Sequence, residues 1–275
     1  MSAERVVVVT GGGTGIGAAT ARRLATDGAR VVVCGRRAAP VEAVAAETGG
    51  LAVAVDAATE EGAARVVAST IDTFGRLDGL VLNAGIMRPG LVEELSVDEW
   101  SKTLRINLTG PFLLARAALP ELRRAGGAIV AVSSVAALRS GPAMASYAAS
   151  KAGLVALANA LAVDHAADGV RVNTVCPGWV RTEMSDEEMA AIAAERGITP
   201  EQAYGMATEL VPQRRAASPD EAAAVIAWLL SDEASYVTGA TVTVDGGTAL
   251  IDAGNVAFGP DAGGSVGSGP QAGAR

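Results

Sequence analysis

Tyr147 and Lys151 stand four residues apart in a segment of helix-forming residues, 146–152 (SYAASKA). Residues at this spacing lie on the same face of a helix. A tyrosine hydroxyl with its ordinary pKa of about 10 is a poor general acid or base at neutral pH, but a neighbouring ammonium group stabilises the phenolate and lowers that pKa. The pair therefore predicts a proton-transferring tyrosine assisted by a lysine. Because this spacing also arises by chance in many helices, the interpretation depends on the motifs around it.

A glycine-rich loop, residues 10–17 (TGGGTGIG), follows the valine run 6–9 and precedes the helix-prone stretch 18–25. A loop of this kind between a strand and a helix brings backbone N–H groups against a pyrophosphate, and the helix dipole favours the negative charge. The alternative is a tight turn that needs glycine only for its positive φ. The setting between a strand and a helix predicts a dinucleotide site.

The choice between the two nicotinamide dinucleotides depends on the end of the second apolar run, where Arg36 and Arg37 follow Cys34 and Gly35. An NAD-preferring site usually places an acidic residue here for the ribose 2′-hydroxyl. Guanidinium groups instead suit the 2′-phosphate of NADP(H). We therefore expect NADP(H), with NAD(H) as the alternative cofactor and a solvated basic turn as the alternative without a ligand.

The elements that must position these residues are short runs rich in β-branched residues, each followed by an alanine-rich stretch of helical period. The runs lie at 6–9, 31–33, 51–55, 80–82, 128–132, 171–175 and 241–244. Strands that alternate with helices form a parallel sheet, and runs without polar alternation are covered on both faces. We predict one α/β domain over residues 1–251, with a Rossmann-like, doubly wound, seven-stranded parallel sheet and helices on both faces.

Two segments depart from this alternation. Residues 183–215 are acidic and helix-prone and interrupt the series between two strands, which predicts a small helical lid near the site. Residues 252–275 are rich in glycine and lack a periodic apolar pattern, as is typical of a C-terminal tail.

Composition excludes several classes of protein. The 275 residues carry a formal net charge of -8, which argues against a nucleic-acid or anionic-membrane surface. Neither a signal peptide nor an uninterrupted apolar span is present, so we expect a soluble, cytoplasmic protein. Two cysteines and one histidine, His165, are too few for a disulfide framework or a metal site. For His165 we expect a helix-capping or surface role.

Further motifs follow one another in order along the chain. They are Thr10-Gly11 with Gly15 and Gly17, Asp56 after the third run, Asn83-Ala84-Gly85, Asn107, Ser134 thirteen residues before Tyr147, Pro177-Gly178 with Thr182, and Val244-Asp245-Gly246-Gly247. Together they resemble the short-chain dehydrogenase/reductase family over residues 5 to about 250, in its single-domain branch of 3-oxoacyl-carrier-protein reductases and glucose dehydrogenases. Leu82 departs from the pattern, because many members have an asparagine there.

The resemblance implies roles for individual residues. The catalytic set is Asn107, Ser134, Tyr147 and Lys151. The cofactor-binding set is Thr10, Gly11, Gly13, Thr14, Gly15, Ile16, Gly17, Arg36, Arg37, Asp56, Ala57, Asn83, Ala84, Gly85, Tyr147, Lys151, Pro177, Gly178, Val180 and Thr182. The substrate-binding set is Ser134, Ala136, Met144, Tyr147 and Trp179. No metal ligand is expected. In this scheme Ser134 and Tyr147 hold the carbonyl oxygen, Tyr147 supplies the proton, and Lys151 lowers the pKa of Tyr147.

The activity implied by the resemblance is NAD(P)(H)-dependent reduction of a ketone to a secondary alcohol, or the reverse reaction. Asn107 would hold a water that passes protons to Lys151. An NAD-linked alcohol, diol or steroid dehydrogenase working oxidatively is the alternative enzyme, and a non-catalytic nucleotide-binding sensor is the alternative of another class. The resemblance also implies a homotetramer or homodimer built on long helices near 99–125 and 147–167. Arg139 hints at an anionic substrate, and Met184, Met189 and Met206 either line a pocket or fill packing gaps.

Overall fold

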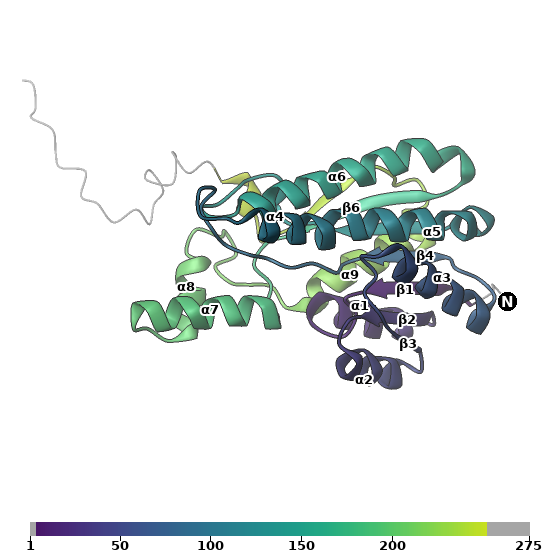
Figure 1. Ribbon diagram of the computed structural model, residues 1–275, viewed down its shortest axis with the longest axis horizontal. Helices are drawn as coiled ribbons and strands as arrows, with labels where there is room; N and C mark the ends of the chain where they lie inside the picture. Colours follow the sequence, from purple (N-terminus) through teal and green to yellow (C-terminus); the bar gives the residue numbers. More distant parts are fainter. Residues whose placement is uncertain (1–3, 252–275) are drawn as a thin grey trace, which may run out of the picture.

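The computed structural model describes residues 4–251 of the chain, whose centre is a seven-stranded parallel sheet (Figure 1). Its order is β3-β2-β1-β4-β5-β6-β7. The strands are β1 (Val6–Thr10), β2 (Arg30–Gly35), β3 (Leu51–Ala54), β4 (Gly79–Leu82), β5 (Ala128–Val132), β6 (Arg171–Pro177) and β7 (Thr241–Val244). The predicted doubly wound parallel sheet is therefore confirmed. The predicted tail, residues 252–275, lies outside the described residues.

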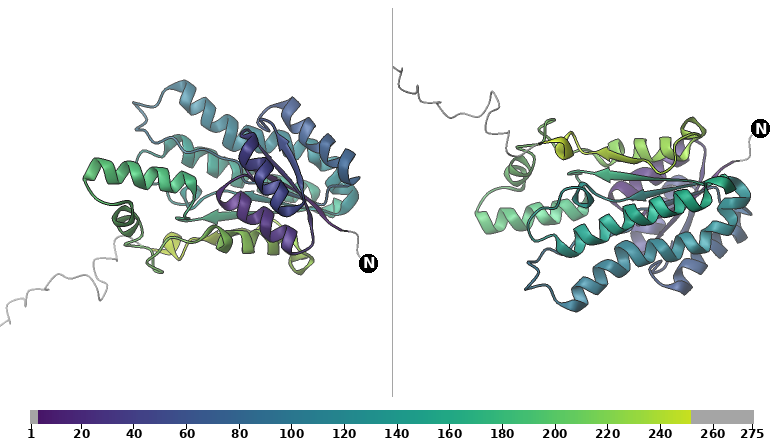
Figure 2. Two further views of the ribbon diagram at one scale, coloured as in Figure 1. Left: turned by 90° about the horizontal axis from the view of Figure 1, so that it is seen from below. Right: turned by 90° about the horizontal axis from the view of Figure 1, so that it is seen from above.

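Helices cover both faces of the sheet. They are α1 (Gly15–Thr26), α2 (Ala38–Thr48), α3 (Glu60–Phe74), α4 (Val97–Leu104), α5 (Gly110–Ala125), α6 (Ala145–His165), α7 (Glu183–Arg196), α8 (Pro200–Ala207) and α9 (Pro219–Leu230). One apolar cluster joins the sheet to α3, α5 and α6, and the other joins it to α1, α2 and α9. Figure 2 shows α5 and α6 in front of the sheet from above, and α1 and α2 in front of it from below.

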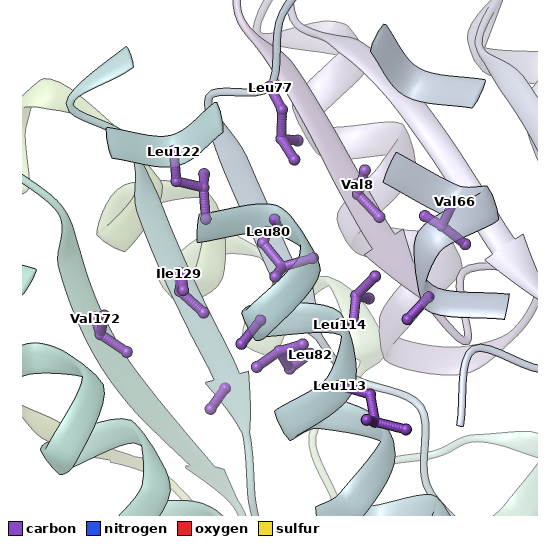
Figure 3. Close-up of a cluster of buried hydrophobic side chains, with 14 of the residues drawn as sticks. Val8, Val66, Leu77, Leu80, Leu82, Leu113, Leu114, Leu122, Ile129 and Val172 are labelled. Atoms are coloured by element: carbon purple, nitrogen blue, oxygen red, sulfur yellow. The ribbon is translucent and has the colours of Figure 1, made fainter. Parts of the chain in front are cut away.

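The four valines of β1 explain why the strands lack polar alternation. Val6 and Val8 belong to the cluster with α3, α5 and α6, whereas Val7 and Val9 belong to the opposite cluster. Successive side chains of a strand point to opposite faces, so a strand covered on both sides needs an apolar residue at every position. Figure 3 shows the first cluster around Leu80. Each fully buried side chain of this size stabilises the fold by about 1.5–3 kcal/mol.

All seven strands are parallel, so their carboxyl ends meet at one edge of the sheet. Thr10 ends β1, Asn83 follows β4, Ser133 and Ser134 follow β5, and Pro177 ends β6. In open α/β sheets, ligands bind outside this edge, where the strand order reverses. The reversal lies between β1 and β4, beside the glycine-rich loop.

Helices α7 and α8 form a unit of their own beyond this edge, hereafter the helical pair, which projects from the body in Figure 1. Met189, Ala193, Ala203 and Tyr204 form its small buried core, against which Trp179 packs. Capping boxes begin both helices, at Thr182 with Ser185 and at Thr199 with Gln202. The helical pair thus lies within the segment 183–215, for which the sequence predicts helices.

Helix α6 is, among the described residues, the one helix long and apolar enough to cross a membrane by length and composition. Leu154, Ala158 and Ala162 on this helix are buried in the cluster that covers the sheet. Its apolar side therefore belongs to the protein core. The same helix presents Tyr147 and Lys151 in its first two turns.

Candidate active site

The glycine-rich loop folds tightly between β1 and α1. Gly11 and Gly15 have φ values of +59° and +52°, a region that side chains with a Cβ rarely adopt. A Cβ on Gly17 would lie 2.3 Å from the carbonyl oxygen of Gly11. Only glycine therefore fits position 17 without moving the loop.

The N-terminus of α1 is equipped for an anion. Its N-cap residue, Thr14, makes no side-chain capping hydrogen bond, and the first turn holds no acidic residue. In contrast, Thr59 caps α3, whose first turn carries Glu60 and Glu61. Free N–H groups and the positive end of a helix dipole suit a pyrophosphate. The loop thus fits the phosphates of a dinucleotide.

Thr10 and Asn83 hold the start of the loop in place by hydrogen bonds. Thr10 Oγ1 donates to Val81 O (3.1 Å) and accepts from the backbone nitrogens of Asn83 (2.8 Å) and Ala84 (3.0 Å). The Asn83 side chain donates to Thr10 O at 2.9 Å. These contacts link the ends of β1 and β4. Leu82, where many family members have an asparagine, is buried in the core cluster beside this turn.

Asp56, which the resemblance assigns to the adenine end of the cofactor, follows β3 by two residues. It accepts hydrogen bonds from the backbone nitrogen of Ala58 (3.1 Å) and from Arg105 (3.0 Å). Burial acts to raise the pKa of Asp56, but these two hydrogen bonds, together with the charges of Arg105 and Arg36, outweigh burial and lower it. Asp56 is therefore a fixed carboxylate. Arg105, which holds it, was not among the predicted site residues.

The two arginines after β2 are not equivalent. Arg37 donates to both carboxylate oxygens of Glu183 in the first turn of α7, at 2.8 and 2.5 Å. Arg36 forms no hydrogen bond within residues 4–251 and contributes only a charge that favours the Asp56 carboxylate. Glu183 thus occupies both terminal nitrogens of Arg37 in this structure. The expected role of Arg36 and Arg37 toward a 2′-phosphate stays a prediction.

Tyr147, Ser134 and Lys151 converge above the end of β5. The Ser134 hydroxyl interacts with that of Tyr147, and Lys151 Nζ lies 5.7 Å from the centroid of the Tyr147 ring. Lys151 is buried and donates to Val132 O at 2.9 Å. The predicted triad is thus brought together by the end of one strand and the first two turns of one helix.

Burial acts on the protonation equilibria of Tyr147 and Lys151. Burial raises the pKa of Tyr147, and Glu188 and Cys176 add to the rise, while Ser134 opposes it. Burial also lowers the pKa of Lys151 to about 8. Desolvation therefore dominates the pKa of both groups in this structure. The lowering of the Tyr147 pKa by Lys151 stays a prediction.

Asn107 lies in a π-helical turn, Arg105–Thr109, between α4 and α5. Its Oδ1 accepts from Ile86 N (2.8 Å), and its Nδ2 donates to Ile86 O (2.8 Å) and Ser150 Oγ (3.0 Å). A Cβ on Gly85 would lie 3.3 Å from Lys151 Nζ and 3.4 Å from Asn107 Oδ1. The two polar groups therefore face the same space, which glycine leaves open. π-Helical turns often occur at functional sites.

The two serines after β5 differ in their contacts. Ser133 Oγ is buried and donates to Lys151 O at 2.9 Å, whereas Ser134 faces Tyr147. Ser133 therefore anchors α6, and Ser134 is the one available for chemistry. Cys176, next to both serines, is fully buried, and burial raises the pKa of its thiol. Sequence reasoning gave no role to Ser133 or Cys176.

The expected substrate residues have different environments. Ala136 is buried just after Ser134, Met144 is the N-cap residue of α6, and Trp179 packs against the helical pair. Val180 forms a bridge with Ala217. Thr182 begins α7, and its side chain would lie 3.0 Å from a Cβ on Gly15. The first turn of α7 therefore borders the glycine-rich loop, which places the helical pair at the mouth of the site.

The methionines, Arg139 and His165, which the sequence analysis also singled out, differ in how exposed they are. Met189 is fully buried in the helical pair and fills its core, whereas Met184 and Met206 are exposed. Arg139 is exposed and donates to Leu138 O. His165 is partly buried and contacts Asp168 and Arg123 near the end of α6, and its role stays a prediction.

Glu188 is a residue of the site that the sequence analysis missed. It is half-buried on α7, burial raises its pKa, and its charge acts on Tyr147. Its place at sequence position 188 gives no local indication of this electrostatic effect.

Fold and site together define the class: an α/β protein whose glycine-rich loop fits a dinucleotide and lies at the sheet edge where Ser134, Tyr147 and Lys151 converge. Comparison with known proteins agrees. The family model described as enoyl-(acyl carrier protein) reductase matches residues 11–249. Protein MoaE of Klebsiella aerogenes is 40% identical over 92% of this chain and 99% of its own length.

Two further relatives carry an activity in their names. Meso-2,3-butanediol dehydrogenase of Serratia marcescens is 36% identical over 90% of this chain and 96% of its own. The crystal structure of levodione reductase superimposes with a TM-score of 0.86 at 36% identity, over 90% of this chain and 98% of that one. The chain belongs to the short-chain dehydrogenase/reductase family. It is thus an NAD(P)(H)-dependent oxidoreductase that interconverts a keto group and a secondary alcohol.

Proposed function

We propose that this enzyme reduces a small, uncharged ketone to a secondary alcohol with NADP(H). The observation that carries the proposal is the convergence of Ser134, Tyr147 and Lys151 at the sheet edge where the glycine-rich loop opens. Arginines rather than an acidic residue follow β2, and Arg36, which has no carboxylate partner among the described residues, favours a 2′-phosphate. Glu188, whose charge reaches Tyr147, disfavours an anionic substrate.

The proposed mechanism assigns the oxygen of the substrate to two hydroxyl groups. When bound, the nicotinamide ring supplies or accepts the hydride. Ser134 donates a hydrogen bond to the carbonyl oxygen and stabilises the charge that develops there. Tyr147 donates its proton to that oxygen during reduction and accepts a proton from the alcohol during oxidation.

Lys151 and Asn107 support this proton transfer. With a pKa lowered to about 8 by burial, Lys151 is mainly protonated at neutral pH and can also exchange its proton. Ser150 Oγ donates to Tyr147 O (2.7 Å) and accepts from Asn107, so it holds the first turn of α6 to the π-helical turn. The space between Lys151 Nζ and Asn107 Oδ1, kept open by Gly85, suits the proton-passing water that we propose there.

We propose that the helical pair is a lid over the substrate. Trp179 connects it to the end of β6, and the charge of Glu188 on α7 raises the pKa of Tyr147. Ala136 and Met144 would form the opposite wall. A lid of this kind excludes water from the reacting groups and selects the substrate.

The alternative direction is NAD-dependent oxidation of an alcohol or diol. The Serratia relative is a diol dehydrogenase by name, and Glu183 reduces the charge that Arg37 offers to a 2′-phosphate. Parallel assays of a panel of ketones, alcohols and diols with NADPH and NADH decide between the two. A comparison of kcat/KM for neutral ketones and their carboxylated analogues tests the role of Glu188. If no substrate of the panel is turned over, the alternative of a non-catalytic nucleotide-binding sensor is favoured.

We also propose that the enzyme works in the cytoplasm as a homotetramer or homodimer. Trp100 on α4, Phe112 on α5 and Val163 on α6 are exposed large apolar residues on the helices expected at the interfaces. Large apolar side chains that are exposed on these helices are candidates for burial between copies of the chain. Sedimentation velocity of the purified protein measures the state directly, and a monomer would contradict the proposal.

A further inference from the structure

The ion pair between Arg37 and Glu183 joins two segments that are 146 residues apart. Arg37 is the N-cap residue of α2 and stands after β2, where a dinucleotide places its adenosine ribose. Glu183 is in the first turn of α7. Both terminal nitrogens of Arg37 are engaged, and one of them also lies 3.4 Å from Thr14 Oγ1 in the glycine-rich loop.

Electrostatics around Arg37 are dominated by carboxylates. A side-chain hydrogen bond from Arg37 lowers the pKa of Glu183, and the same bond raises the pKa of Arg37. Glu187, one helical turn further on, adds a second negative charge near the guanidinium. A 2′-phosphate would therefore meet two carboxylates beside the group that should bind it. A neutral 2′-hydroxyl would not be repelled.

We propose that Glu183 is a specificity-determining residue for the cofactor, and that it weakens binding of the 2′-phosphate by holding Arg37. The inference rests on the proposed nucleotide site. In this arrangement Arg36 is the one free guanidinium of the pair within the described residues, and Arg37 adds to the affinity for the phosphate only after it leaves Glu183. The balance between NAD(H) and NADP(H) thus depends on a residue of the helical pair.

The decisive variant is Glu183→Gln, which keeps the size of the side chain and removes its charge. The probes are ADP-ribose and 2′-phospho-ADP-ribose, because they test binding without hydride transfer, and isothermal titration calorimetry measures both affinities. An exposed ion pair contributes up to about 1 kcal/mol, which corresponds to about five-fold in an equilibrium constant. We expect 2′-phospho-ADP-ribose to bind about five-fold more tightly and ADP-ribose to change less than about two-fold.

A matched control is available in the same helical pair. Arg181 donates to both carboxylate oxygens of Glu201 at 2.8 and 2.6 Å, so Glu201→Gln removes an equivalent ion pair. It should leave the ratio of the two affinities unchanged. In the background of Arg37→Gln, the substitution Glu183→Gln should lose most of its effect, because the guanidinium that it releases is gone.

Each outcome separates this inference from the proposed function. If wild-type protein binds both probes and Glu183→Gln leaves their ratio unchanged, or tightens both equally, the role of Glu183 is refuted while the nucleotide site stands. A full effect of Glu183→Gln in the Arg37→Gln background refutes the route through Arg37. If wild-type protein binds neither probe, the nucleotide site fails and the inference fails with it.

Discussion

Substitution of Gly17 by alanine tests whether the glycine-rich loop is built by close backbone approach. The new Cβ would lie 2.3 Å from Gly11 O and 2.6 Å from Asn83 Nδ2, far inside ordinary contact. Overpacking of this kind costs up to about 3 kcal/mol, and the better helix propensity of alanine returns about 1 kcal/mol. We therefore expect a net loss of about 2 kcal/mol, or a Tm lowered by about 4–8 °C.

The same substitution should also abolish dinucleotide binding, because the atoms that must move belong to the phosphate loop and to the side chain that braces it. Thermal unfolding followed by circular dichroism measures the first effect, and calorimetric titration with ADP-ribose measures the second. Gly205→Ala is the matched control: Gly205 lies in α8 with no atom within 4 Å of a new Cβ. It should raise stability by about 0.5–1 kcal/mol and leave binding intact. Wild-type stability and affinity in Gly17→Ala would refute the reasoning.

Three further predictions concern the catalytic groups. Tyr147→Phe should lower kcat/KM by at least about 100-fold while ADP-ribose affinity is kept, and near-wild-type turnover would remove Tyr147 from its role. Because the charge of Glu188 raises the pKa of Tyr147, Glu188→Gln should lower that pKa and shift the rising limb of kcat/KM for alcohol oxidation to lower pH. An unchanged pH profile would contradict this. Glu195 is exposed on α7, so Glu195→Gln is the control, and the same shift in that variant would also contradict the role of Glu188. Asn107→Ala should lower the free energy of unfolding by about 2–3 kcal/mol, because it leaves the backbone groups of Ile86 without their partners. Urea unfolding measures this change. A decrease below about 0.5 kcal/mol would contradict a structural role for Asn107.

The helical pair connects several of these results. Its first turn carries Glu183, which holds Arg37, and its next turn carries Glu188, which acts on Tyr147. One helix therefore carries a carboxylate that holds Arg37 and another whose charge raises the pKa of Tyr147. Any motion of α7 would change both electrostatic environments together.

Much of the fold was predictable from the sequence because its causes are local. Consecutive valines predict a strand covered on both faces, and the cluster membership of Val6 to Val9 confirms the reason. Glycines at fixed spacing after such a strand predict the tight loop, since φ and the space for a Cβ depend on near neighbours. The ordered motifs led to the family, which the comparisons confirm. The roles of the individual site residues remain predictions.

What only the tertiary structure decided are the contacts between distant segments. Neither the pairing of Arg37 with Glu183, nor that of Arg105 with Asp56, has any periodic or local trace in the sequence. The direction of the Tyr147 pKa follows from how deeply the ring is buried and from which charges reach it. The sequence by itself therefore determined the fold class, the loop and the chemistry of the side chains. Their charges and freedom to bind depend on burial and on partners across the fold, which only folding brings together.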